Sequence, residues 1–405
     1  MHIALCSPTW PPAQSANSIV SYISSVRDYL VSSGHQVSVI SEGRLFPTEG
    51  GPITVSFPSQ PSSILYNMIA RAERRFHRPD GGLPEVGRRV AAEVMAVHRM
   101  SPIDVLEMEE SFGWSRLVQR LAGVPVITRL HGPYFLKPER LRSGNEVRAD
   151  QSRCRAEARA VRSATAVTAP TRAIMRATCE AYSRPATSPN TVIPNPIQID
   201  PCARQWRLSD CERDHILMVG RFDYWKGADI MLMAFERLLE KRPQARLTLV
   251  GPDTGIEVTP GRTIGFAAYS RAILSPQARE RVRFLGMLAP QRIDELRLAA
   301  NVSVVASRCE NSPYVLLEAF AAGCPVLSTD WLGSDEIVVS GETGLLTPVG
   351  EPAILAQRLQ WLLEHPLEAA GMGAAGRKRC ARDFSVKVIG SQLLDCYRAT
   401  IRQSS

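Results

Sequence analysis

The chain has 405 residues, of which 44% are hydrophobic and 22% are charged. This composition is typical of a soluble globular protein, and the length predicts two domains. No apolar run reaches the ~18 residues of a transmembrane helix, and the first residues lack the basic and apolar regions of a signal peptide. The nine cysteines form no C-x-x-C pair, so we expect reduced thiols in a cytoplasmic protein.

The net charge of +8 is concentrated in the first half of the chain. Residues 1–196 hold 23 Lys and Arg against 16 Asp and Glu, whereas the remainder holds 25 against 24. Four arginines follow the apolar stretch 64–69: Arg71, Arg74, Arg75 and Arg78. They predict either an amphipathic helix on an anionic membrane or a solvated helix face. No finger spacing or aromatic-interleaved basic groove indicates nucleic acid.

Hydrophobic periodicity predicts alternating strands and helices through the first half. A strand at 2–6 leads through a polar, proline-containing loop to a helix whose apolar residues recur from Ile19 to Leu30, and Gly34 ends that helix. Further strands are predicted at 37–40, 103–106, 124–130 and 164–169, with helices at 86–100 and 148–162. This order is typical of a parallel α/β sheet.

The same alternation resumes after a proline-rich segment at 192–208, which indicates a domain boundary. The predicted strands are 215–219, 246–250, 283–285, 302–306 and 325–329. The predicted helices are 228–241, 293–300, 313–322 and 385–402. We therefore expect two doubly wound α/β domains with a ligand in the cleft between them, at the carboxyl ends of both sheets.

One helix of the second half carries two glutamates near its start. Ser312 as N-cap and Pro313 as first residue predict that the helix begins just after the strand 302–306. A helix N-terminus in that position suits a phosphate. Glu310 before the helix and Glu318 within it would then flank the phosphate, where carboxylates suit the hydroxyls of a sugar and a ribose. The alternative is a pair of ordinary surface glutamates.

A second loop, which follows the strand 215–219, carries two cations. Arg221 and Lys226 are five residues apart, so that a guanidinium fork and a mobile ammonium can both reach one diphosphate. Such a pair is common on surface loops and becomes specific only beside the two-glutamate helix. The chain has no Asp-x-Asp motif for a metal-held sugar nucleotide, so these cations and the helix N-terminus would replace a divalent metal.

These motifs resemble those of the retaining glycosyltransferases of GT-B family 4, the glycosyl transferases group 1. Glu310-x7-Glu318 is similar to the family's E-x7-E, and Gly220-Arg221-x4-Lys226-Gly227 to its diphosphate loop. Further similarities in the second half lie at 249–251, 282–286 and 341–346, and looser ones in the first half lie at 34–37, 130–132 and 193–195. The resemblance thus covers nearly the whole chain, with specific motifs in the second half. The resemblance implies an acceptor-side Rossmann-like domain at 1–196, completed by a C-terminal helix at 385–403, and a nucleotide-sugar domain at 197–384.

The resemblance also implies a role for each candidate residue. The catalytic candidates are His131, Arg221, Lys226 and Glu310. The donor-binding candidates are Asn17, Ser18, Gly286, Met287, Ser312, Tyr314, Val315 and Glu318. The two cations would stabilise the leaving diphosphate, Glu310 would hold the donor sugar, Glu318 would bind the ribose, and His131 would face the sugar.

The remaining candidates would contact other parts of the donor. Backbone N–H groups of Tyr314 and Val315 would meet the phosphate, and Gly286 with Met287 would border the nucleobase. Asn17 and Ser18 stand where the family commonly has Gly-Gly, and neither residue gives the clearance of glycine for the donor phosphates.

The implied activity is that of a retaining hexosyltransferase (EC 2.4 class) that needs no cofactor or metal. It would move a hexose from a nucleotide sugar, with a UDP-sugar favoured over GDP-mannose, to a glycan or lipid-linked acceptor in surface polysaccharide assembly. We expect it in the cytoplasm or peripherally on the inner face of the plasma membrane. The alternative is a non-catalytic GT-B-fold protein that binds a sugar nucleotide or a partner transferase. A Rossmann dehydrogenase is excluded, because residues 7–18 contain no glycine.

Overall fold

The computed structural model consists of two compact units. One comprises Met1–Pro196 together with Val386–Ser405, and the other comprises Ile197–Ser385. The structure describes residues 1–12, 17–41, 44–48, 53–54, 83–137, 144–200 and 202–404. The first unit thus contains both ends of the described chain, whereas the second unit is continuous in sequence. The arginine cluster at 71–78 lies outside the described residues.

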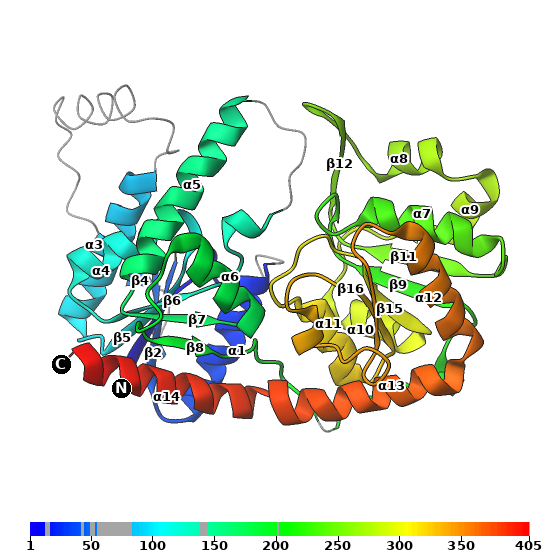
Figure 1. Ribbon diagram of the computed structural model, residues 1–405. Helices are drawn as coiled ribbons and strands as arrows, with labels where there is room; N and C mark the ends of the chain where they lie inside the picture. The colour runs from blue at the N-terminus through cyan, green and yellow to red at the C-terminus, as the bar shows by residue number, and fades with distance from the viewer. Residues whose placement is uncertain are drawn as a thin grey trace. The chain divides into compact units, whose positions relative to one another are not determined.

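The first unit is built on an eight-stranded sheet in the order β4-β3-β2-β1-β5-β6-β7-β8, counted over the described residues (Figure 1). Its strands are β1 (His2–Cys6), β2 (Gln36–Ser41), β3 (Arg44–Phe46), β4 (Ile53–Thr54), β5 (Val105–Glu109), β6 (Val126–Arg129), β7 (Ala166–Ala169) and β8 (Asn190–Val192). The neighbours in the run β2-β1-β5-β6-β7-β8 pair in parallel. At one edge, β3 pairs antiparallel with β2 and β4 pairs antiparallel with β3.

Helices pack on both faces of this sheet. Successive residues of a strand point to opposite faces, so a strand can contact helices on both sides. The helices are α1 (Ser18–Ser32), α3 (Leu83–Met100), α4 (Trp114–Ala122), α5 (Gly144–Ser163), α6 (Arg172–Tyr182) and α14 (Val386–Ser404). In β5, Leu106 and Met108 belong to the apolar cluster that includes α3 and α4. Glu107 lies between them and accepts a hydrogen bond from the hydroxyl of Tyr397 on α14 at 3.0 Å.

The second unit contains a six-stranded, all-parallel sheet in the order β14-β11-β9-β15-β16-β17. These strands are β9 (His215–Val219), β11 (Arg246–Val250), β14 (Val282–Phe284), β15 (Val302–Val305), β16 (Val326–Thr329) and β17 (Leu345–Thr347). A small separate sheet contains β10 (Phe222–Asp223), β12 (Asp253–Thr259) and β13 (Arg262–Ile264).

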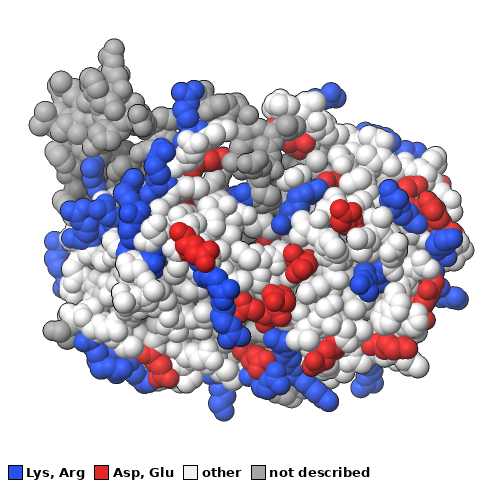
Figure 2. Space-filling view, in the orientation of Figure 1, with Lys and Arg blue, Asp and Glu red and all other residues white. Residues whose placement is uncertain are grey.

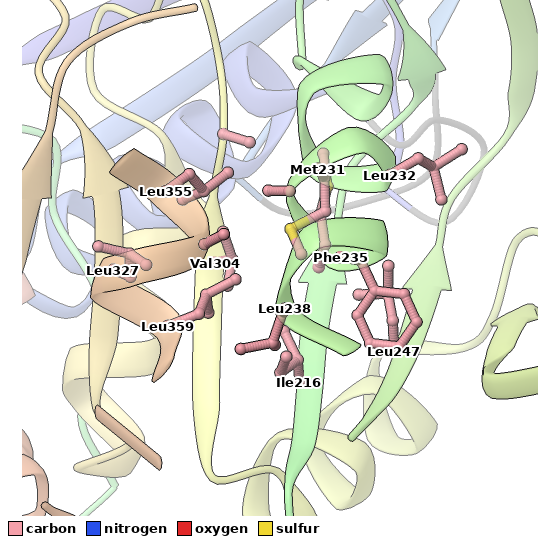
Figure 3. Close-up of a cluster of buried hydrophobic side chains, with 14 of the residues drawn as sticks. Ile216, Met231, Leu232, Phe235, Leu238, Leu247, Val304, Leu327, Leu355 and Leu359 are labelled. Carbon is pink, nitrogen blue, oxygen red and sulfur yellow. The ribbon is translucent and has the colours of Figure 1, made fainter. Parts of the chain in front are cut away.

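Helices cover both faces of the larger sheet. They are α7 (Ala228–Leu239), α8 (Phe266–Ile273), α9 (Pro276–Arg281), α10 (Pro290–Ala299), α11 (Tyr314–Ala322), α12 (Pro352–Glu364) and α13 (Pro366–Arg379). Figure 3 shows α7 and α12 packed over the strands through Phe235 and Leu359, with Val304 of β15 between them. The next residue, Val305, packs on the opposite face with Phe320 of α11. This two-sided burial explains why the strands read as continuous apolar runs.

Most of the elements that the periodicity predicts are present with ends shifted by a few residues. The hairpin β12–β13 was not predicted, because its residues are largely exposed and polar and show no apolar pattern. The periodicity also does not predict helices α4, α6, α8, α9, α12 and α13 or the short strands β3, β4, β8, β10 and β17. None of the nine cysteines, all of which lie among the described residues, is in a disulfide. No helix of the described part of the chain is long and apolar enough to cross a bilayer.

Candidate functional site

Two loops of the second unit lie side by side because they follow neighbouring strands. The loop 220–227 follows β9 and leads into α7, and the loop 306–313 follows β15 and leads into α11. Strands β9 and β15 are hydrogen-bonded in parallel, so both loops leave the same edge of the sheet. The carboxyl edge of a parallel sheet is where ligands of doubly wound folds bind.

The catalytic candidates of the two loops are in direct contact. The ammonium Nζ of Lys226 lies 2.5 Å from Oε1 of Glu310. The same oxygen accepts a hydrogen bond from the hydroxyl of Ser307 at 2.7 Å. The side chain of Glu310 is largely buried, at 11% exposed, and that of Lys226 is partly exposed, at 26%. The structure therefore brings together two residues that are 84 positions apart in the sequence.

Arg221 lies on the same loop and pairs with a different carboxylate. Its Nε donates to Oδ2 of Asp223 at 2.6 Å, and Oδ1 of Asp223 accepts from the backbone N–H of Lys226 at 2.7 Å. Asp223 thus fixes the guanidinium and the backbone at Lys226 simultaneously. The sequence analysis did not single out Asp223, although its place between the two cations could have indicated such a brace.

A buried ion pair joins the two loops below these residues. Arg308 donates from Nη1 and Nη2 to the two carboxylate oxygens of Asp229, each at 2.7 Å, and from Nη1 to the carbonyl of Tyr224 at 2.7 Å. Its guanidinium also lies 3.8 Å from the centre of the Tyr224 ring. Bidentate pairs of this kind combine strength with fixed geometry. The two loops are therefore held in register before any ligand binds.

Gly227 shows how closely the loops approach. Its φ is +68°, and a Cβ at this position would lie 1.9 Å from the carbonyl oxygen of Ala306. Only glycine combines the left-handed conformation with this clearance.

The start of α11 differs from the expectation by one residue. Pro313 is the N-cap, with extended φ −72° and ψ 126°, and Tyr314 is the first helical residue. The expectation that Ser312 caps the helix is therefore wrong; the restricted φ of proline is equally compatible with the cap position. Tyr314 and Val315 are the first two residues of α11, so their backbone N–H groups belong to the first helical turn, where N–H groups point out of the helix end. The expected backbone donors are thus at the helix start, and Ser312 precedes them with a buried side chain.

Glu318 lies one helical turn further along α11 and is 38% exposed. Its Oε2 accepts from Nη2 of Arg297 on α10 at 2.6 Å. Gly286 and Met287 follow β14, where Gly286 has φ +64° and Met287 is 65% exposed. The Phe284 ring just before them stacks on another aromatic ring, that of Phe266, at 4.7 Å.

The candidates of the first unit have local roles. Asn17 is the N-cap of α1: its Oδ1 accepts from the N–H of Ile19 at 2.9 Å, with extended φ and ψ. Asn17 therefore does not use the left-handed conformation that asparagine tolerates. Ser18 begins the helix and is exposed. The His131 ring meets the Tyr22 ring edge-on at 4.9 Å.

Burial and the positive charge of Arg129 lower the pKa of His131 well below its ordinary value. The imidazole is therefore neutral near pH 7.

Two fully buried carboxylates hold the loop that carries His131, and the sequence analysis missed both. Glu110 accepts from the backbone N–H groups of His131 and Gly132 at 2.9 and 2.8 Å. Glu157 on α5 accepts from the N–H of Tyr134 at 2.9 Å. Burial, together with the nearby charge of Glu157, raises the pKa of Glu110 to about 8. A run of acidic residues at the end of a predicted strand was the available signal.

Two family profiles match the chain, one on each half. The profile described as Glycosyltransferase Family 4 matches residues 19–201, and the profile described as Glycosyl transferases group 1 matches residues 204–379. The chain belongs to the family 4 glycosyltransferases.

Curated members of this family align with the chain to different extents. A D-inositol 3-phosphate glycosyltransferase of Arthrobacter is 25% identical over 407 residues, which cover 97% of this chain and 92% of the relative. The enzyme of the same name from Corynebacterium efficiens is 31% identical over 45% of this chain and 42% of its own length. A glycogen synthase of Mycobacterium tuberculosis is 29% identical over 49% of this chain and 45% of its own length. The matches to the last two relatives therefore span less than half of each.

Solved structures show the fold of the family. Sucrose-phosphate synthase from Thermosynechococcus elongatus superposes with a TM-score of 0.75 at 21% identity, over 99% of both chains. HepE from Anabaena in complex with UDP and glucose superposes with a TM-score of 0.66 at 20% identity, over 98% of this chain and 100% of the other. The fold is GT-B, with two Rossmann-like domains, as the sequence predicts.

Proposed function

We propose that this protein is a retaining glycosyltransferase that moves a hexose from a nucleotide sugar to a glycan or lipid-linked acceptor. The carrying observation is the contact between Lys226 and Glu310 across two loops at the carboxyl edge of the sheet. It joins a phosphate-binding cation to a carboxylate that suits sugar hydroxyls, beside the helix start at Tyr314. Family membership supports the same activity.

The proposed chemistry follows from the charge of the leaving group. As the bond between the anomeric carbon and the diphosphate oxygen breaks, negative charge develops on the diphosphate. Lys226, Arg221 and the N-terminus of α11 would stabilise that charge, which is commonly the largest contribution to catalysis. The acceptor oxygen would bond to the anomeric carbon on the face that the diphosphate leaves, while its hydroxyl proton passes to the departing phosphate, so that the anomeric configuration is retained. Glu310 would hold the sugar hydroxyls and is not proposed as a nucleophile.

The neutral His131 is proposed as a hydrogen-bond partner of the donor sugar, as the family resemblance implies. We propose a UDP-sugar as donor, with GDP-mannose as the second possibility. One structural relative, HepE, is described in complex with UDP-glucose, which supports the uridine nucleotide.

We also propose that catalysis needs no divalent metal, since Arg221 and Lys226 supply the cations at the diphosphate. Excess EDTA should leave the transfer rate unchanged, and a loss of activity that Mg²⁺ restores would contradict this.

Positive charge on the first unit supports an anionic or membrane-borne acceptor. Figure 2 shows mostly Lys and Arg side chains over the helices α3 to α5. The exposed arginines of these helices are Arg88, Arg89, Arg99, Arg120, Arg148, Arg155, Arg159 and Arg162. Such a surface is attracted to anionic lipid headgroups. Co-sedimentation with liposomes should rise with the fraction of anionic lipid, and binding that is independent of this fraction would remove the membrane part of the proposal.

A thermal-shift panel of UDP-, GDP-, ADP- and dTDP-sugars tests the donor site directly. A ligand at ~100 times its dissociation constant stabilises the folded state by about 2.7 kcal/mol, which gives a clear shift. We expect one nucleotide class to stabilise the wild type and to lose its effect in Lys226→Ala. If no donor shifts the unfolding temperature and none supports transfer, the result favours the alternative, a non-catalytic protein with the GT-B fold.

A further inference from the structure

Arg297 is a buried cation held between two carboxylates. Its side chain, on α10, is 2% exposed. Nη1 donates to Oδ1 of Asp294 at 2.5 Å, and Nη2 donates to Oε2 of Glu318 at 2.6 Å. Asp294 is 66% exposed and Glu318 is 38% exposed. The guanidinium therefore links a surface carboxylate on its own helix to a partly accessible carboxylate on α11.

Stability alone does not account for a guanidinium in this position. Removing a cation from water is costly, and an apolar side chain of similar volume often stabilises a fold as well as a buried ion pair does. The neighbouring residues Leu296 and Leu298 do pack against apolar clusters. Moreover, Nε of Arg297 is buried and meets no acceptor among the described residues. The arginine therefore keeps its contact with Glu318 although one of its hydrogen-bond donors has no acceptor in the part of the chain that the structure describes.

We propose that Arg297 is a positioning residue that makes the donor site selective for ribose over 2′-deoxyribose. This inference rests on the proposed function, in which Glu318 binds the ribose hydroxyls. Asp294 holds the guanidinium, and the guanidinium holds Oε2 of Glu318. The carboxylate plane is thereby fixed, and Oε1 can accept a hydrogen bond from a ribose hydroxyl without the ligand having to order a flexible side chain. Preorganisation of this kind increases affinity by reducing the cost of binding.

The same helix provides a matched control. Arg292 and Glu295 form an ion pair with the same spacing on α10, but both are exposed, at 60% and 62%. Substituting Arg292 removes a helical arginine and an ion pair without altering any contact of Glu318. Asp294→Asn is a second test variant. It weakens the anchor of Arg297 at a surface position, where a single substitution rarely prevents folding.

The experiment compares the affinity of UDP, GDP and ADP with that of their 2′-deoxy analogues by titration calorimetry. Hydrogen bonds to charged groups predict a ribose preference of about 10- to 100-fold for the wild type. We expect Arg297→Met and Glu318→Gln each to abolish most of this preference, by lowering the affinity for the ribonucleotide and leaving the affinity for the 2′-deoxynucleotide nearly unchanged. Asp294→Asn should reduce the preference partly, and Arg292→Met should retain it in full.

The outcomes separate the inference from the proposed function. A full ribose preference in Arg297→Met and in Asp294→Asn would overturn the role of Arg297 while the donor site stands. An equal loss of affinity for both sugars in Arg297→Met would also overturn it, because it would show a general structural role. If the wild type binds none of these nucleotides or their sugars, the proposed function fails and the inference fails with it.

Discussion

The loops at the carboxyl ends of the two sheets are built in different ways. In the second unit, charged side chains from separate loops contact one another directly, as Lys226 contacts Glu310. In the first unit, the backbone around His131 is held from beneath by the buried carboxylate of Glu110. The second arrangement leaves a motif of fixed spacing in the sequence, whereas the first leaves only scattered acidic residues. A site whose contacts are made by side chains can therefore be predicted from a sequence motif. A site whose backbone groups are held by buried side chains is much harder to predict.

The largest effect should come from the second-unit cation. Lys226→Ala should lower the transfer rate by about 10²–10³-fold, as the loss of one group that stabilises developing charge typically does. The fold should persist, because the side chain is partly exposed. Initial rates at saturating donor measure the effect.

Lys241→Ala is the matched control for this change, since Lys241 is an exposed lysine of the same unit. Near-normal turnover by Lys226→Ala would remove the second-unit loops from the chemistry.

Two glycines test whether the loops of the second unit are more tightly packed than a turn of the first unit. Gly34 and Gly227 both have positive φ, +80° and +68°, but only Gly227 is crowded by backbone. Gly34→Ala should cost about 1–2 kcal/mol of unfolding free energy, from the left-handed conformation alone. Gly227→Ala should cost about 1–3 kcal/mol more, because its Cβ overpacks the interface of the two loops. Urea unfolding measures both, and equal costs would show that the loops can move apart freely.

The third effect concerns pH and the first unit. Because the pKa of Glu110 is raised from 4.5 to about 8 in the folded protein, its proton is bound more tightly in the folded state than in the unfolded state. Its contribution to stability is therefore present below pH 4.5 and is lost as the pH rises towards about 8. Urea unfolding between pH 5 and pH 9 should show a smaller decline in Glu110→Gln than in the wild type.

Glu180→Gln, at an exposed glutamate of the same unit, should decline in parallel with the wild type. A parallel decline in Glu110→Gln as well would show that Glu110 does not carry this pH dependence.

Much of the fold could be predicted because apolar periodicity is local. Strands β9 and β11 occupy the predicted residues, since each is a short apolar run buried on both faces. The hairpin β12–β13 could not be found in this way, because its stability depends on strand pairing rather than on an apolar pattern. Its Pro260-Gly261 turn was the only local signal.

The candidate site shows the same limit. Spacing singled out Lys226, Glu310 and Glu318, which the structure places at one edge of one sheet. It could not single out Arg297 or Arg308, because the partners that define their roles come from other helices. Nor could spacing show that the side chain of Asn17 caps helix α1, since capping depends on the local backbone geometry.

The position of α14 has a consequence for synthesis on the ribosome. This helix belongs to the first unit, where Tyr397 donates to the buried Glu107, yet it is translated after the whole of the second unit. The amino-terminal strands must therefore wait for the last helix, while the second unit, continuous in sequence, can complete its own core earlier. A nascent chain arrested before residue 386 should expose the groove that α14 fills, which makes the first unit the later of the two to mature.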